Sequence, residues 1–184
     1  MSEEIQSSSK ALITQRIPPI WGMSAKVGKE HIDVWGHTNN VCYVQWMQDV
    51  AVGHSEAIGW DSKRYLDRGA IWVVRSHKVD YKRSSCLGNI ILAQTWIEEM
   101  KRVSCLRRYR FIELPESITN EEVQNLCGFT SSSVFNFPGS TLLATASTTW
   151  AFVSTETFKP VKIFPEIVSV FQEVSKDASA TPSS

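Results

Sequence analysis

Residues 33–43 constrain this chain more than any other stretch of its sequence. They read Asp-Val-Trp-Gly-His-Thr-Asn-Asn-Val-Cys-Tyr, so a carboxylate, a glycine, a histidine and two asparagines lie within eight residues. Gly36 permits a turn conformation that residues with a Cβ atom resist. Asn39 is a favourable N-cap, because its side-chain oxygen can accept a hydrogen bond from an N–H group two or three residues later. The stretch therefore predicts a tight loop that leads directly into a helix.

The sequence after this loop has the periodicity of a long amphipathic helix. Apolar residues recur at helical spacing from about residue 40 to residue 58, and Gly59 then provides a stop. The start of such a helix exposes unpaired N–H groups and the positive end of the helix dipole, which stabilise a developing negative charge. The carboxylate of Asp33 is thus predicted beside an anion-binding helix terminus, an arrangement that suits acyl-transfer chemistry.

The motif Asp-x-x-Gly-His-x-Asn-Asn-x-x-Tyr, followed by a long helix, resembles the signature of the hotdog-fold acyl-CoA thioesterases. The branch that it resembles most contains the 4-hydroxybenzoyl-CoA thioesterases, and the resemblance extends over roughly residues 20–165. It implies hydrolysis of an acyl-CoA thioester to a free acid and coenzyme A. Coenzyme A is then part of the substrate, and no separate cofactor is expected.

The resemblance also implies roles for individual residues of the motif. Asp33 takes the position of the catalytic aspartate, which either attacks the thioester carbonyl or activates a water molecule. The N–H of Asn40 matches the donor to the thioester oxygen. His37 is a further catalytic candidate, although it can equally pack beside the glycine and hydrogen-bond the loop. Four residues of the loop and helix start are expected to bind the substrate: Trp35, Gly36, Asn39 and Tyr43.

A second group of candidates lies in the tight connection between two predicted strands. Lys101 and Arg102 occupy this turn, and Ser104 follows it. The resemblance implies that the turn contacts the phosphates of coenzyme A, for which charged donors are suited. The alternative is a solvated hairpin tip, the usual location of such charges. Three arginines of the next strand are further candidates, or simply members of a half-exposed strand face: Arg107, Arg108 and Arg110.

Most of the remaining sequence predicts strands. Five segments alternate in polarity or are rich in β-branched and aromatic residues, namely residues 21–32, 71–82, 90–98, 103–113 and 142–153. Short connections between most of them favour antiparallel pairing. The expected fold class is therefore α+β, with an antiparallel sheet of about five strands wrapped around one long central helix. The hotdog fold, which the resemblance implies, has this architecture.

The chain is expected to form a single domain between two flexible tails. Residues 1–17 are polar and serine-rich and form the first tail, residues 18–175 form the hotdog thioesterase domain, and residues 176–184 form the second tail. A polar segment at about 115–139 interrupts the strand pattern and is expected to be an insertion with a short helix at 120–126.

Charge and hydropathy argue against several kinds of partner. The 19 basic and 19 acidic residues leave no overall field that attracts nucleic acid or an anionic membrane. No apolar run approaches the ~20 residues of a spanning helix. The four cysteines are dispersed, without a Cys-x-x-Cys pair. We therefore expect a cytoplasmic protein whose partner is a small-molecule acyl-CoA.

Two other functions stay open at this level. One is a hotdog domain that binds an acyl thioester without hydrolysing it. The other is a metal-dependent oxygenase, because His31, Asp33 and His37 are residue types that bind mononuclear iron. Such sites normally use a rigid β-scaffold and a distant second histidine, whereas a long helix follows this cluster at once. Incidental proximity is the preferred interpretation, and no metal is expected.

Two of the predicted strands have the composition of a sheet edge that pairs with another chain. Residues 142–153 contain no charge, and residues 71–82 begin with an apolar run. Unpaired edges are a hazard unless they are covered or paired. We expect one of these strands to continue its sheet into a second copy. The resemblance then implies a homodimer, or a tetramer of dimers, in which one chain supplies Asp33 and the other supplies part of the coenzyme A surface.

Overall fold

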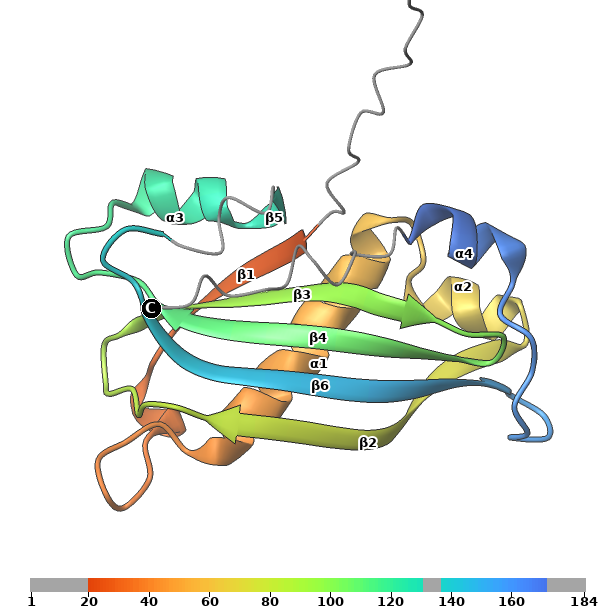
Figure 1. The fold of residues 1–184 in the computed structure, drawn as a ribbon, viewed down its shortest axis with the longest axis horizontal. Helices are drawn as coiled ribbons and strands as arrows, with labels where there is room; N and C mark the ends of the chain where they lie inside the picture. The colour runs from red at the N-terminus through yellow and green to blue at the C-terminus, as the bar shows by residue number, and fades with distance from the viewer. Residues whose placement is uncertain (1–19, 131–136, 172–184) are drawn as a thin grey trace, which may run out of the picture.

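The computed structural model describes residues 20–130 and 137–171. The two predicted tails, 1–17 and 176–184, lie outside the described residues, as does the segment 131–136 of the predicted insertion. In the described part, one antiparallel sheet of six strands packs against a long helix, and three shorter helices lie at its margins (Figure 1).

The sheet has the strand order β2-β6-β4-β3-β1-β5. Its strands are β1 (Ile20–Lys26), β2 (Ala70–Tyr81), β3 (Ile90–Met100), β4 (Ser104–Glu113), β5 (Gly128–Thr130) and β6 (Thr141–Ser154). The helices are α1 (Asn40–Ala57), α2 (Ser62–Asp67), α3 (Asn120–Leu126) and α4 (Pro165–Val170), together with the 3-10 turn η1 (Lys29–His31). The longest helix is α1, with 18 residues, and it crosses one face of the sheet (Figure 1).

The helix predicted after the motif is confirmed. Asn39 caps α1, since its side-chain oxygen accepts a hydrogen bond from Val41 N–H at 3.0 Å. Gly59 follows the helix with a φ of +79°, which satisfies its C-terminal end in a conformation that glycine favours. The α+β class and the antiparallel pairing are also as expected.

Two expectations about the architecture are corrected. The sheet has six strands rather than about five, because residues 128–130 of the predicted insertion form the strand β5, which pairs with β1. The long helix is accompanied by three shorter ones, of which α3 confirms the short helix expected at 120–126. The first strand ends at Lys26 instead of continuing to residue 32, because the backbone of Val27 turns to bond with Asn89 and the chain then enters η1.

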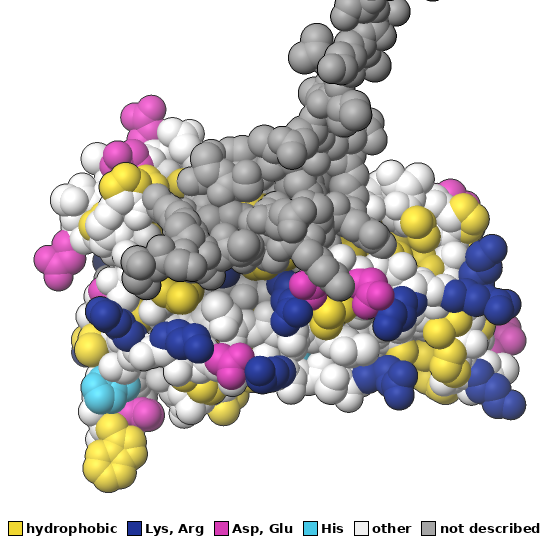
Figure 2. Space-filling view, in the orientation of Figure 1, with side chains coloured by type: hydrophobic (Ala, Val, Ile, Leu, Met, Phe, Trp, Pro, Cys, Tyr) yellow, Lys and Arg dark blue, Asp and Glu magenta, His cyan; other side chains and the backbone are white. Residues whose placement is uncertain are grey.

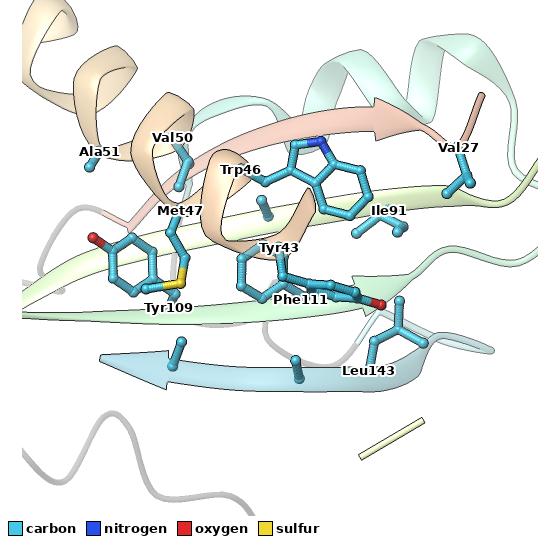
Figure 3. Packing of buried hydrophobic residues seen from close by; sticks show 13 residues of the cluster. Val27, Tyr43, Trp46, Met47, Val50, Ala51, Ile91, Tyr109, Phe111 and Leu143 are labelled. Carbon is cyan, nitrogen blue, oxygen red and sulfur yellow. The ribbon is translucent and has the colours of Figure 1, made fainter. Parts of the chain in front are cut away.

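The apolar face of α1 packs on the middle of the sheet (Figure 3). Met47 and Val50 are fully buried there against Ile91, Phe111 and Leu143, which come from β3, β4 and β6. Full burial of a side chain of this size contributes about 1.5–3 kcal/mol. The helix is therefore a firm support for the loop that precedes it.

The two edges of the sheet differ in length. Of the two strands considered as candidates for a pairing edge, residues 142–153 are excluded, because β6 lies between β2 and β4, whereas residues 71–82 belong to the edge strand β2. The 12-residue strand β2 forms one edge, and the three-residue strand β5 forms the other. In the described residues, no helix is both long and apolar enough to cross a bilayer.

Candidate active site

Asp33 lies in the loop of residues 33–39, called the Asp33 loop below. Its Oδ1 atom accepts hydrogen bonds from the backbone N–H groups of Trp35 at 2.8 Å and His37 at 3.2 Å. Gly36 closes the turn with a φ of +81°, and its N–H donates to the carbonyl of Asp33 at 3.1 Å. The second carboxylate oxygen, Oδ2, makes no hydrogen bond to a described residue. One oxygen is thus held while the other is free to react.

The start of α1 adjoins this loop. Asn40 is the first helical residue, and its N–H donates to no described residue, as expected at a helix start. Its carbonyl oxygen accepts a hydrogen bond from the hydroxyl of Tyr81, which lies at the end of β2, at 3.1 Å. The geometry leaves the Asn40 N–H available as a donor to an oxyanion.

Three buried side chains with hydroxyl groups form a hydrogen-bonded network that joins the Asp33 loop to the rest of the fold. Ser85 Oγ donates to Thr38 Oγ1 at 2.7 Å, and the backbone N–H of Thr38 donates to the Ser85 carbonyl at 2.8 Å. The hydroxyl of Tyr43 lies 3.2 Å from Ser85 Oγ. Sequence reasoning missed Thr38 and Ser85, because their pairing joins positions 47 residues apart. Tyr43, which was expected to bind substrate, lies buried in this network.

The two histidines near Asp33 have different surroundings. His37 is exposed, and only its backbone is bonded to Asp33. His31 accepts a hydrogen bond from Gly28 N–H at its Nδ1 atom, at 2.9 Å, and its ring packs edge-on against Trp46. Among the described residues, no group of three or more His, Cys, Asp or Glu side chains is arranged to hold a metal ion. The iron-oxygenase alternative therefore finds no support in the geometry.

The tip of the Asp33 loop is apolar and exposed. The side chains of Val34 and Trp35 are 93% and 81% exposed. Adjacent large apolar side chains in this state are typical of a surface that another molecule covers. Trp35 was expected to bind substrate, but within one chain it does not line a cavity formed by the described residues.

The predicted phosphate-binding turn lies at the opposite end of the sheet (Figure 1). Lys101 and Arg102, called the basic turn below, are exposed between β3 and β4, and Lys101 pairs with Glu99 at 3.4 Å. Ser104 begins β4 beside them. The 11 residues of β3 separate the turn from the Asp33 end, a distance on the order of 30 Å. One chain therefore does not bring the basic turn and Asp33 together.

A cavity of about 330 Å³ lies at the basic-turn end, between the C-terminal half of α1, α2 and the sheet. Five of its 17 lining residues are aromatic, and this cavity is called the aromatic cavity below. Its aromatic residues are Trp60, Tyr65, Trp72, Trp150 and Phe171. Sequence reasoning missed it, because its walls come from segments scattered between residues 48 and 171.

The guanidinium of Arg107, a buried cation, also lines the aromatic cavity. Arg107 is only 4% exposed, and its Nη1 atom donates to His54 Nδ1 at 3.0 Å and to Thr95 Oγ1 at 3.2 Å. Burial, together with the adjacent guanidinium, lowers the pKa of His54 well below its ordinary value, so the imidazole is neutral. Burial raises the pKa of the neighbouring Cys105 thiol to about 11. That thiol therefore stays protonated and is a poor nucleophile.

The other arginines of β4 are on the outer face of the sheet, which is turned to the viewer in Figure 2. Lysine and arginine side chains lie there among aspartates and glutamates (Figure 2). Arg108 pairs with Glu98, and Lys78 pairs with Asp80 at 3.3 Å. The predicted alternation of β4 is confirmed, but Arg107 belongs to its buried side rather than to a half-exposed face.

A sequence model of the acyl-ACP thioesterase N-terminal domain matches residues 18–126, well over half of the chain. The chain belongs to the acyl-ACP thioesterase family. No curated protein matches this family member by sequence. The resemblance to thioesterases found in residues 33–43 is thus confirmed at the level of the family.

Solved structures with this fold include thioesterases of several kinds. DHNA-CoA thioesterase from Staphylococcus aureus is 18% identical, with a TM-score of 0.63 over 82% of this chain and 87% of that one. A mutant 4-hydroxybenzoyl-CoA thioesterase in complex with 4-hydroxybenzoyl-CoA is 11% identical, with a TM-score of 0.68 over 83% of this chain and 99% of that one. A Lactobacillus plantarum protein assigned as an oleoyl thioesterase is 15% identical, with a TM-score of 0.69 over 86% of this chain and 52% of that one. These similarities establish a hotdog-like fold for the acyl-ACP thioesterase family member.

Proposed function

We propose that this chain hydrolyses acyl thioesters of coenzyme A to a free acid and the thiol, with Asp33 as nucleophile or general base. One observation carries the proposal: a carboxylate with one fixed and one free oxygen lies in the loop that leads directly into α1, where the N–H of Asn40 donates to no described residue. Membership of a thioesterase family supports the reaction class.

Two routes use this geometry. As a nucleophile, the carboxylate of Asp33 bonds to the thioester carbon, the thiolate leaves, and water then hydrolyses the anhydride. As a general base, Asp33 removes a proton from the water that attacks. In both routes, negative charge develops on the thioester oxygen, and the N–H of Asn40 stabilises it. One such donor is worth about 3 kcal/mol of barrier in a well-studied protease. His37 stays a second candidate for proton transfer, since it is exposed on the same loop.

A thioester of acyl carrier protein is the second candidate substrate, because the matching family is that of the acyl-ACP thioesterases. Thiol release from a panel of acyl-CoA and acyl-ACP esters of equal chain length separates the two carriers. The purified chain should release thiol from at least one of them. No release from any member of either series would favour the alternative of a non-catalytic acyl-thioester-binding domain.

Pairing of two β2 edges gives the proposed active species. The strand β2 runs from the cavity end of the sheet to the Asp33 end, where Tyr81 bonds to Asn40. Antiparallel pairing about a two-fold axis therefore brings the Asp33 loop of one copy toward the basic turn and aromatic cavity of the other. It also offers a surface that covers Val34 and Trp35. A homodimer, alone or within a tetramer, is thus the proposed active form.

The assignment of Asp33 is tested by Asp33→Asn. The amide oxygen still accepts the hydrogen bonds from Trp35 and His37, so the loop should keep its fold. Turnover should fall at least about a thousandfold, because an amide is neither a nucleophile nor a base here. Thiol release and circular dichroism measure the two properties.

Asp61→Asn is the matched control. Asp61 likewise accepts a hydrogen bond from a backbone N–H group, that of Arg64 at 2.7 Å, but it caps α2. This variant should keep full turnover. Near-native turnover in Asp33→Asn would show that its carboxylate only closes a turn.

A further inference from the structure

The aromatic cavity holds a cation for which the described residues supply no anion. Arg107 forms no ion pair with any carboxylate in the described part of the chain. Glu56 lines the same cavity but is exposed, and it does not lie within ion-pair distance of the guanidinium. Burying a charge is costly unless it is paired and hydrogen-bonded. The cavity therefore presents an unused site for negative charge.

The hydrogen bonds of Arg107 leave a specific part of its guanidinium open. Its two hydrogen bonds to described side chains, those of His54 and Thr95, both use Nη1, while Nε and Nη2 donate to no described residue. Arginine only donates, so His54 Nδ1 accepts and the ring carries its hydrogen on Nε2. The ring of Phe171 lies 5.6 Å from the guanidinium carbon. These contacts fix the guanidinium in place. Its Nε–Nη2 side stays open, and the two N–H donors on that side match the two oxygens of a carboxylate.

We infer that the aromatic cavity binds the carboxylate of a small molecule with an apolar body, and that Arg107 holds that carboxylate. The cavity volume of about 330 Å³ is within the range of small-molecule sites, about 300–1,000 Å³. The aromatic wall, including Trp60, Trp72 and Trp150, accommodates the apolar body. Asp33 does not line this cavity, so the site is separate from the carboxylate proposed to act in catalysis.

Two sources supply this ligand chemistry. One is the far end of an acyl group that carries a second carboxylate, presented as a thioester. The other is a free carboxylic acid, such as a product of hydrolysis. The binding itself does not depend on turnover, and it is expected in the Asp33→Asn protein as well.

The direct test compares octanoate with octanamide, which has the same shape and no charge. Calorimetric titration of the full chain should give an affinity for octanoate at least about tenfold above that for octanamide, because hydrogen bonds to charged groups are the stronger ones. Octanoate should also raise the melting temperature more than octanamide does. Equal binding of the two probes, or no binding of octanoate, overturns the inference, and this comparison needs no variant.

Variants locate the site. Arg107→Gln should remove the preference for octanoate, and Arg107→Lys should keep part of it. Arg108→Gln is the matched control, since Arg108 is the next residue but lies on the outer face, paired with Glu98. Octanoate preference that survives in Arg107→Gln overturns the inference.

Kinetics distinguishes the two sources. Octanoyl-CoA is compared with the eight-carbon acyl-CoA that ends in a carboxylate. A higher kcat/KM for the second ester that disappears in Arg107→Gln assigns the carboxylate to the acyl group. Inhibition of both esters by octanoate, with no preference between them, assigns it to the free acid. Either result supports the carboxylate site.

Discussion

The two ends of the sheet present different groups. The Asp33 end has a fixed carboxylate, an open helix start and an exposed Trp35, but Asp33 does not line the aromatic cavity. The other end has the aromatic cavity and the basic turn, and the exposed carboxylate fixed there, Asp61, caps the short helix α2. The length of β3 keeps the two ends apart. This difference supports the proposal that the active form is a dimer, in which each site takes Asp33 from one copy and the basic turn from the other.

Mixed subunits test the division with the largest expected effect. One chain carries Asp33→Asn, and the other carries Lys101→Ala together with Arg102→Ala. A one-to-one mixture should form half of its dimers from unlike chains, each with one intact site. Activity at low substrate concentration should then reach about a quarter of the wild-type value, compared with about a tenth for the Lys101→Ala and Arg102→Ala parent and almost none for the Asp33→Asn parent. Thiol release after unfolding and refolding the mixture measures it.

The control is a mixture of two batches of the Asp33→Asn chain, treated in the same way. It should stay inactive, because no dimer contains an intact carboxylate. A failure of the unlike mixture to exceed the average of its parents would mean that each chain uses its own two ends. A fully active monomer by light scattering would contradict the division more directly.

The basic turn should act on affinity rather than on the chemical step. Lys101→Ala with Arg102→Ala is expected to raise the KM for coenzyme A esters about tenfold, since exposed charge pairs each contribute about 0.2–1 kcal/mol. The KM for short thioesters without the nucleotide should change little. Lys63→Ala is the control, because Lys63 is also exposed and pairs with Asp67 on α2. An equal rise for both classes of ester would indicate structural damage instead of lost phosphate contacts.

The predictable parts of this molecule are those that local sequence determines. The loop at Gly36, the cap at Asn39 and the helix α1 depend on neighbouring residues, and the structure places all three as expected. The aromatic cavity was not predictable, because it is formed by long-range packing. Arg107 illustrates the limit: in the sequence it is followed by Arg108 and Arg110 and suggests a solvated strand, yet the pleat turns it inward.

The strand β5 and the helix α2 show the same limit. The three residues of β5 are too few to produce a strand pattern, and they become a strand only because β1 has a free side. The helix α2 has six residues, and its periodicity is too short to read. Tyr65 of α2 lines the aromatic cavity, so the helix and this part of the cavity wall were missed for the same reason.

The neutral His54 makes the cavity end sensitive to acid. Its pKa in the folded chain is lowered well below the ordinary 6.5 by burial and by Arg107. The unfolded chain therefore binds more protons below that pH, and the free energy of unfolding should decrease as the pH falls below about 6.5. The slope approaches at most about 1.4 kcal/mol per pH unit. Urea unfolding between pH 7.5 and 5 measures it.

His54→Gln keeps an acceptor for Arg107 but does not titrate, so most of this slope should disappear. A smaller slope of the same sign is left by His77, whose pKa is also lowered by partial burial. His37→Gln, at the exposed Asp33 end, is the control and should retain the wild-type slope. An unchanged slope in His54→Gln would mean that the acid sensitivity does not come from the cavity end.

The smallest expected effect is that of Gly36→Ala, which tests the geometry of the Asp33 loop separately from the stability of the whole fold. Gly36 has a φ of +81°, and a Cβ atom there meets nothing within 4 Å, so Gly36→Ala strains only the backbone. The expected loss is about 1 kcal/mol of unfolding free energy. Gly88→Ala is a matched control, because Gly88 has a φ of +90° and equally open surroundings in another loop. Urea unfolding should give similar losses for both variants. Turnover should fall severalfold in Gly36→Ala alone, since the turn that places the two N–H donors on Asp33 is the one that is strained. Equal turnover in the two variants would show that the chemistry tolerates a displaced Asp33.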